Sequence, residues 1–217
     1  MNREKMLQAR EWIRGELKAC TEFWLKNGID RENGGVYTCL DRSGRVFSTD
    51  KSVWMQGRCG WIFAYLCHVY GVRQEWLEAS RSCLDFMDEH CFNPQAKGRM
   101  YFTVTAEGEP LRQRRYYFSE AFCAIANAEY YGVTGDEKRL ERARECYEMY
   151  WQLSRGMADP TGMGPKTEPQ TRSGRGFGIP MIFLNVSSVL MRTDTQRKAL
   201  YEERDQMCVD EIFTYHV

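Results

Sequence analysis

The sequence has no excess of charge of either sign, no long apolar run and no ordered pattern of cysteines. Its 30 Lys and Arg residues balance 30 Asp and Glu residues, so it lacks the basic field that nucleic acid or an anionic membrane surface selects. No apolar run reaches the ~18 residues that a membrane-spanning helix needs, and the charged amino-terminal segment lacks the apolar core of a signal peptide. We therefore expect a cytoplasmic protein that binds neither nucleic acid nor a membrane.

The nine cysteines occur at irregular spacings and include no CxxC pair. This excludes the disulfide framework of a small secreted protein and predicts reduced, buried thiols. The sequence also lacks HExxH, P-loop and GxSxG motifs and any cluster of metal ligands. These absences exclude the most common metalloprotease, phosphate-binding and serine hydrolase sites, and we expect neither a metal nor a cofactor.

Helical periodicity is what the 217 residues do contain. Predicted helices cover residues 7–27, 53–70, 74–90, 118–133, 136–153, 179–191 and 195–213. The second, fourth and sixth are apolar on nearly every face, which is typical of buried helices, whereas the helix after each of them carries charge on one side. A short hairpin is predicted within residues 36–47, with its turn at Asp41 to Gly44, and another β-prone segment at residues 100–105.

The alternation of buried and amphipathic helices repeats along the chain. The triplet Tyr-Gly-Val occurs at residues 70–72, where the second helix ends, and recurs at residues 131–133, where the fourth ends. Each unit therefore pairs a buried helix with an exposed one, as in a double-layered α/α toroid. We expect an all-α protein that forms an incomplete arc of about seven helices, with short β-hairpins in its loops. A closed toroid of six helix pairs needs roughly twice this length, so we interpret residues 1–217 as one α/α-toroid domain, truncated on its carboxyl-terminal side.

Candidate ligand-binding residues gather where the three buried helices begin. In a toroid, these helix ends and their loops surround the central cavity. Arginine donates paired hydrogen bonds to adjacent oxygens, and aromatic faces stack on the C–H faces of sugars, so the combination favours a polyhydroxylated or anionic ligand. The candidates are Trp54, Arg58, Tyr116, Ser119, Glu120, Lys166, Arg172 and Arg175. The alternative interpretation of each is a solvated loop charge or a core aromatic residue.

Candidates for acid–base chemistry are few. Glu120, beside Arg115 and Tyr116, is one, but the sequence gives it no second partner. Of the three histidines, we interpret His68 as a core residue of a buried helix and His216 as part of a frayed chain end. The residues by themselves therefore indicate no complete proton-transfer site.

At these same positions the sequence resembles the N-acylglucosamine 2-epimerase family, which also contains cellobiose 2-epimerases and aldose–ketose isomerases acting on mannose-type sugars. The matching stretches are residues 23–66, 114–137 and 165–186, and they extend over nearly the whole chain. The resemblance implies an (α/α)6 toroid whose central cavity binds an aldose. It also implies an isomerase that removes and returns the proton at C2 of the ring-opened sugar, through an enediolate.

The resemblance assigns roles to several of the candidates. Arg58, in the segment WMQGR that Trp54 begins, matches an arginine that contacts the sugar oxygens and would stabilise the enediolate. Lys166, with Arg172 and Arg175, matches a basic loop that lines the cavity. The rim of the next inner helix carries Tyr116, Ser119 and Glu120.

The resemblance also implies that catalytic groups are missing. The family's acid/base pair consists of two histidines, both expected beyond the carboxyl-terminal end of this chain, one of them near a PGHxxE-type segment that the sequence lacks. One interpretation is therefore a sugar 2-epimerase that retains its sugar-binding residues without its catalytic histidines. The alternatives are a non-catalytic α/α-repeat module that binds a sugar or a protein partner, and an assembly in which a second copy or a complementary half-toroid closes the cavity.

Overall fold

The computed structural model describes residues 2–164, 166–168, 170–172 and 174–217. Residues 165, 169 and 173 of the predicted basic loop lie outside this range. The helices of the described residues are α1 (Arg3–Asn27), α2 (Val53–Tyr70), α3 (Gln74–His90), α4 (Phe118–Thr134), α5 (Glu137–Ser154), α6 (Gly178–Thr193) and α7 (Lys198–Tyr215). Each of the seven predicted helices is confirmed, with its ends displaced by a few residues at most.

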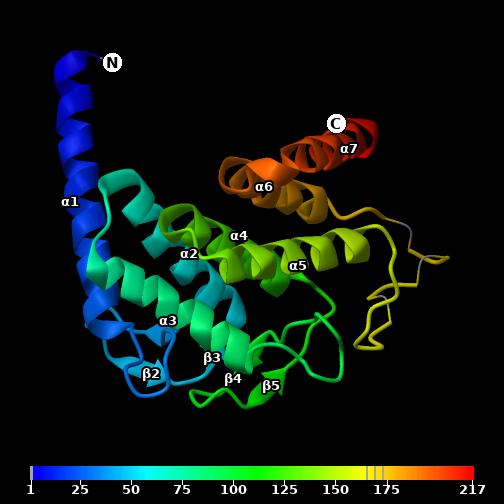
Figure 1. Cartoon of the computed structure of the whole chain (residues 1–217), viewed down its shortest axis with the longest axis horizontal. Helices are drawn as coiled ribbons and strands as arrows, with labels where there is room; N and C mark the ends of the chain where they lie inside the picture. Colours follow the sequence, from blue (N-terminus) through cyan, green and yellow to red (C-terminus); the bar gives the residue numbers. More distant parts are fainter. Residues whose placement is uncertain (1, 165, 169, 173) are drawn as a thin grey trace.

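The helices form two layers of an open arc (Figure 1). The inner helices α2, α4 and α6 pack side by side, and each is covered by the helix that follows it in the chain. Helix α1 stands at one edge of the arc, α6 and α7 lie at the other, and the space between them is open. The predicted arc of an α/α toroid is confirmed.

Local chemistry accounts for the helix ends and for the close contact between the inner helices. The Asn2 side chain caps α1 by accepting a hydrogen bond from the backbone N–H of Lys5 at 2.9 Å. Gly135 ends α4 in the left-handed conformation with φ of 72°, which glycine adopts without steric cost. A Cβ atom at Gly57 of α2 would lie 2.7 Å from the backbone of Phe122 in α4, so glycine allows these two helices to touch.

Short strands tie the loops together at the end of the arc where the inner helices begin. Strand β1 (Cys39–Leu40) pairs antiparallel with β2 (Val46–Ser48) and confirms the predicted hairpin. A second sheet has the order β3 (Lys51–Ser52), β4 (Thr103–Val104), β5 (Pro110–Arg112). Because β3 leads directly into α2, this sheet fixes the start of that inner helix against the loop before α4.

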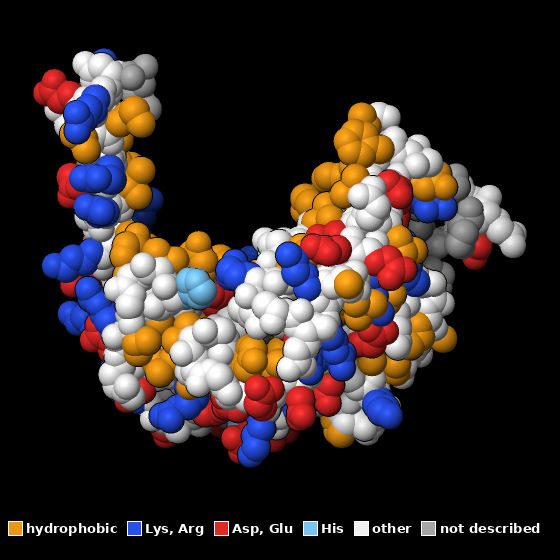
Figure 2. Space-filling view, turned by 45° about the horizontal axis from the view of Figure 1, so that its top comes forward, with side chains coloured by type: hydrophobic (Ala, Val, Ile, Leu, Met, Phe, Trp, Pro, Cys, Tyr) orange, Lys and Arg blue, Asp and Glu red, His pale blue; other side chains and the backbone are white. Residues whose placement is uncertain are grey.

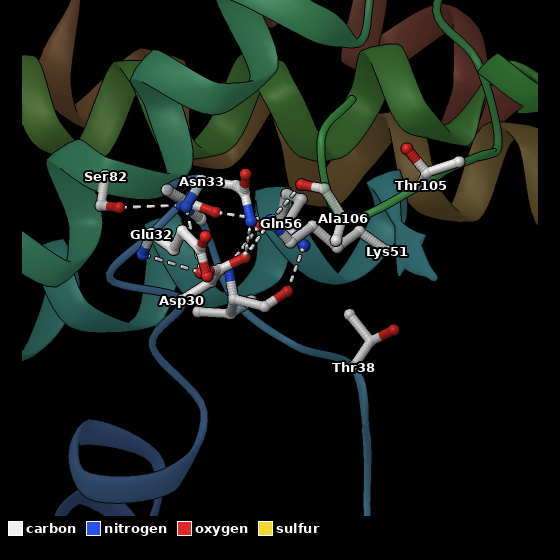
Figure 3. A network of polar contacts seen from close by, with 12 residues as sticks. Asp30, Glu32, Asn33, Thr38, Lys51, Gln56, Ser82, Thr105 and Ala106 are labelled. Carbon is white, nitrogen blue, oxygen red and sulfur yellow. Dashed lines mark hydrogen bonds and ion pairs between the residues drawn. The ribbon is translucent and has the colours of Figure 1, made fainter. Parts of the chain in front are cut away.

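A buried polar network holds the loop between α1 and α2 (Figure 3). Lys51 and Asp30, whose side chains are 0% and 1% exposed, form an ion pair of 2.7 Å. The Lys51 ammonium also donates to the carbonyl oxygens of Gly34 and Ala106, both at 2.8 Å. Every donor of this buried cation is thereby satisfied, which offsets much of the cost of burying it.

Asp30 has an altered proton affinity in this network. Burial alone would raise the pKa of its carboxyl group, but hydrogen bonds from Lys51 and from the backbone N–H groups of Asn33 and Glu32 outweigh that effect. The pKa of Asp30 therefore lies below its ordinary value of 3.8. The carboxylate stays ionised in the folded protein at all but acidic pH.

The cysteines are free thiols, as predicted, but not all of them are buried. Seven are buried, Cys39 is partly exposed and Cys20 on α1 is exposed, which corrects the expectation for these two. Burial raises the pKa of the Cys59 thiol to about 12. Across the described part of the chain, no helix combines the length and the apolarity needed to cross a membrane.

Candidate functional site

One face of α2 lies along the concave side of the arc. Its residues follow one another at steps of three and four, the spacing of one helix face, and they are Trp54, Arg58, Trp61, Tyr65 and His68. Two of these residues, Arg58 and Trp61, line a cavity of about 450 Å³ whose walls also include residues of α1, α4 and α6. Figure 2 shows the hollow between the two arms of the arc, with hydrophobic side chains on the side of α1 that faces it.

The cavity is apolar except for a few polar groups. Its aromatic walls are Trp24, Trp61, Phe63 and Phe122. Arg58 of α2 and Asn185 of α6 supply polar atoms, and both side chains are exposed. Mostly apolar walls with a few converging polar groups are typical of a small-molecule site.

Arg58 is the cation of this cavity. Its guanidinium carbon lies 4.3 Å from the centre of the Phe122 ring, so the planar group rests on an aromatic face. None of the described residues forms a hydrogen bond or an ion pair with its side chain. Its N–H groups are therefore available to a ligand with adjacent oxygen atoms.

Trp54 packs with other aromatic side chains at the start of α2. Its ring meets Phe102, Phe118 and Phe122 edge to face, at centroid distances of 5.0, 5.5 and 6.0 Å. The indole is only partly buried, but its Nε1 atom is enclosed and has no hydrogen-bond partner in the part of the chain that the structure describes. Trp54 thus supports Phe122, and the Arg58 guanidinium rests on the Phe122 ring.

Ser119 and Glu120 lie in the interior behind the cavity. The Ser119 hydroxyl donates to the carbonyl of Tyr101 at 2.9 Å and is buried. Glu120 is 0% exposed and accepts hydrogen bonds from Nε of Arg99 at 2.7 Å and from the backbone N–H of Met100 at 2.8 Å. Its carboxylate anchors the loop before α4 and is not part of the cavity wall.

Arg99 connects several groups of that loop. It is itself fully buried, and it also pairs with Asp159 and donates to the carbonyl oxygens of Arg114 and Tyr116. Burial lowers the pKa of this guanidinium, but the charges of Glu120 and Asp159 raise it by more. The arrangement fixes the backbone that carries the rim residues.

The rim candidates from the two loops separate into two groups. Lys166 donates to the hydroxyl of Tyr116 at 3.4 Å, so the structure brings these two together beside α4. Arg175 instead lies 3.9 Å from the centre of the Tyr215 ring at the end of α7, and Arg172 is exposed on the loop. The basic loop therefore runs from the rim of α4 to the edge of the arc.

Two features of the concave face escaped the sequence reasoning. Asn185 lines the same cavity as Arg58, and its signal in the sequence is a polar residue within a mostly apolar run of the inner helix α6. His68 is not a core residue, as its helix suggested, because its side chain is 40% exposed and pairs with Glu129. Apolar composition alone could not show that one face of α2 borders the open centre of the arc.

Paired inner and outer helices around a concave, aromatic-lined face define an α/α-toroid protein. Within that class, the chain belongs to the N-acylglucosamine 2-epimerase family, whose family model matches residues 35–215. It is 31% identical over 212 residues to N-acylglucosamine 2-epimerase of Bos taurus, covering 95% of this chain and 50% of the relative. The human protein of the same name is 27% identical over 220 residues and is likewise covered to 50%. The chain thus spans about half the length of the curated relatives it matches.

Solved structures show the same fold. The cellobiose 2-epimerase of Spirochaeta thermophila superposes with a TM-score of 0.82 at 20% identity, covering 99% of this chain and 55% of that protein. A D-mannose isomerase superposes with a TM-score of 0.73 at 16% identity, and the match covers 93% of this chain and 50% of the isomerase. At these identities the likeness speaks for the fold alone.

Proposed function

We propose that this chain provides the sugar-binding half of a carbohydrate 2-epimerase of the N-acylglucosamine type. The observation that carries the proposal is the Arg58 guanidinium, which pairs with none of the described residues and lies on the wall of an aromatic-lined cavity that Asn185 also lines. Family membership supports it, since the relatives named above carry out 2-epimerisation by their names. The ligand is then a small polyhydroxylated aldose.

The chemistry that this cavity favours is stabilisation of negative charge beside a carbonyl. Removing the proton at C2 of an open-chain aldose leaves an enediolate, with charge shared between the oxygens on C1 and C2. A guanidinium donates two parallel hydrogen bonds to such an oxygen pair, and the apolar walls would strengthen that interaction once further helices close the arc and exclude water. Arg58 would therefore hold the sugar and stabilise the intermediate.

The base that removes the proton is the part this cavity lacks. None of the described residues that line it is a histidine or a carboxylate, whereas the reaction needs a base within hydrogen-bond reach of the C2 proton. From the resemblance to the family, we expect two histidines in the other half of the toroid. We infer that proton transfer depends on residues that the other half supplies.

Closure of the arc follows from the same proposal. Large apolar side chains on the free part of α1 are exposed, and they are Met6, Leu7, Trp12 and Ile13. At the opposite edge, Phe213 and Tyr215 of α7 are also exposed. Exposed apolar edges of this kind favour burial against further helices, in a complementary half-toroid or in a second copy of the chain.

The test is exchange of the C2 proton of N-acetylmannosamine in deuterated water, followed by NMR. The chain is measured alone and mixed with the carboxyl-terminal half of the bovine relative, with light scattering to detect assembly. We expect C2 proton exchange only in the mixture. Arg58→Ala should reduce the exchange rate roughly 100-fold or more, because this is the usual effect of losing a hydrogen-bond donor to a developing oxyanion. Arg45→Ala, at an exposed position of the hairpin, is the matched control.

Two outcomes would contradict the proposal. Sugar binding without exchange in an assembled mixture would favour the non-catalytic binding module. Exchange that survives Arg58→Ala would remove the arginine from the mechanism.

A further inference from the structure

Positive charge gathers at the end of the arc where the inner helices begin, although the chain as a whole carries no net charge. Residues 110–118, which lead into α4, contain three arginines and no acidic residue. Residues 160–177, which lead into α6, contain three basic residues and one glutamate. The chemistry proposed above uses one cation at this end of the arc, Arg58, and leaves these charges without a role.

Two contacts hold these loops beside each other. Nε of Arg115 donates to the carbonyl oxygen of Gly164 at 2.6 Å, and the Lys166 ammonium donates to the hydroxyl of Tyr116 at 3.4 Å. The Lys166 nitrogen also lies 5.9 Å from the centre of the Tyr116 ring. Arg115 and Lys166, which come from different loops, therefore meet on one part of the rim.

Trp54 connects Arg58 with a second arginine at this rim. Its ring meets Phe122, on which Arg58 rests, at a centroid distance of 6.0 Å, and it meets Phe102 at 5.0 Å. The guanidinium carbon of Arg114 lies 3.8 Å from the centre of the Phe102 ring. In the described part of the chain, the Arg114 side chain has no hydrogen-bond or ion-pair partner. Two guanidinium groups therefore rest on rings that contact the same tryptophan.

A third cation reaches the same aromatic group from the loop before α6. Phe118 meets Trp54 at a centroid distance of 5.5 Å and stacks on Tyr116 at 6.0 Å. Tyr116 is the ring beside which Lys166 lies. Arg58, Arg114 and Lys166 are thus arranged around Trp54, each held through aromatic rings that contact it.

The acidic groups in the interior behind this rim are already paired. Glu120 and Asp159 both form ion pairs with Arg99, so they do not neutralise the cations around Trp54. The inner helices add to the positive potential, because the N-terminus of a helix carries partial positive charge. By the residues described, α2, α4 and α6 all begin without a side-chain hydrogen bond at the N-cap. An anion with several oxygen acceptors would therefore be stabilised at this rim.

We propose that Arg114 and Lys166 form an anion subsite for the phosphate group of a phosphorylated aldose whose carbonyl end contacts Arg58. This inference rests on the proposed function and names its substrate class as a sugar phosphate. A phosphate monoester carries about −1.5 to −2 charges at pH 7, and arginine and lysine both bind phosphate oxygens. A phosphate on the carbon farthest from the carbonyl keeps its charge away from C2, where the proton is removed. Such a ligand uses all three cations, whereas a neutral aldose uses Arg58 alone.

The experiment measures binding of N-acetylmannosamine and N-acetylmannosamine 6-phosphate to the wild-type chain by calorimetry at pH 7. We expect the phosphate group to raise the affinity at least about tenfold, which is the gain from one charge-assisted hydrogen bond. Arg114→Gln and Lys166→Gln should each remove most of this preference. Arg81→Gln, at an exposed position of the outer helix α3, removes the same charge and is the matched control. It should retain the preference.

Inorganic phosphate is a further probe, because a surface that only attracts anions would bind it as tightly as the sugar phosphate. That result, or equal affinities for the two sugars in the wild-type chain, would overturn the subsite. A preference that survives in both Arg114→Gln and Lys166→Gln would overturn it too. Failure of both sugars to bind would instead contradict the proposed function itself, and Arg58→Ala should weaken both.

Discussion

A structural role and a catalytic role can be told apart at Glu120. Its carboxyl group could act in acid–base chemistry, but its surroundings are those of a residue that anchors a loop. The substitution Glu120→Gln preserves the shape of the side chain and removes its charge. Arg99 would remain buried with Asp159 and two carbonyl oxygens as its partners. The backbone N–H of Met100 would keep an acceptor only if the new amide oxygen faced it.

The expected loss in the free energy of unfolding follows from these contacts. Removing one partner of a buried ion pair costs about 3–5 kcal/mol in the free energy of unfolding. Since Asp159 still pairs with Arg99, we expect the lower end of that range, about 3 kcal/mol. For a chain of this size, about 1 kcal/mol corresponds to a fall of roughly 2–4 °C in Tm, so the melting temperature should fall by about 6–12 °C.

The assay is thermal and urea unfolding followed by circular dichroism, with sugar affinity measured below the transition. Glu22→Gln is the control, because Glu22 pairs with Lys18 at 3.7 Å on the exposed surface of α1, and such pairs contribute about 0–1 kcal/mol. We expect Glu120→Gln to lower stability and to leave the sugar affinity of the folded protein unchanged. A variant that melts within about 2 °C of wild type but loses sugar binding would refute the reasoning.

Three further outcomes follow from the structure. The pKa of Asp30 is lowered in the folded state, so its ion pair stabilises the protein above the ordinary pKa, and this stabilisation is lost as the pH falls through the lowered value. The free energy of unfolding in urea should therefore fall from pH 7 to pH 3. In Asp30→Asn, the part of this fall that is due to Asp30 should be absent. In thiol labelling at pH 8, exposed Cys20 should react first, whereas buried Cys59, with a pKa raised to about 12, should react only after denaturation. Gly57→Val should lower the free energy of unfolding by about 2 kcal/mol or more, because its side chain meets the backbone of Phe122, and equal urea midpoints would contradict this close contact.

The helices were predictable because their information is local. Apolar residues at steps of three and four, interrupted by turns such as that at Gly135, define the ends of α4 and α5 to within a few residues. Strands β3 and β5 were not predicted. They are two and three residues long, and Lys51 pairs with Val104 across the intervening helices α2 and α3, a distant partner that no local pattern records.

The residue types of the candidate site were more predictable from the sequence than its geometry. The sequence pointed to Arg58 beside aromatic residues at the start of an inner helix, and the structure places it on a cavity wall. It could not distinguish that exposed arginine from Arg99, which is fully buried. Burial of a charged residue depends on partners distant in the sequence, here Glu120 and Asp159, and no local pattern records them.

The measurement that tests the central claim most directly is residue-resolved NMR of the chain during titration with N-acetylmannosamine. The account predicts that the largest chemical-shift changes occur at Arg58, Trp61 and Asn185 on the cavity wall, and that they disappear in Arg58→Ala while Arg45→Ala retains them. Shifts confined to the outer helices α3 and α5, or shifts that persist in Arg58→Ala, would contradict a sugar site on the concave face.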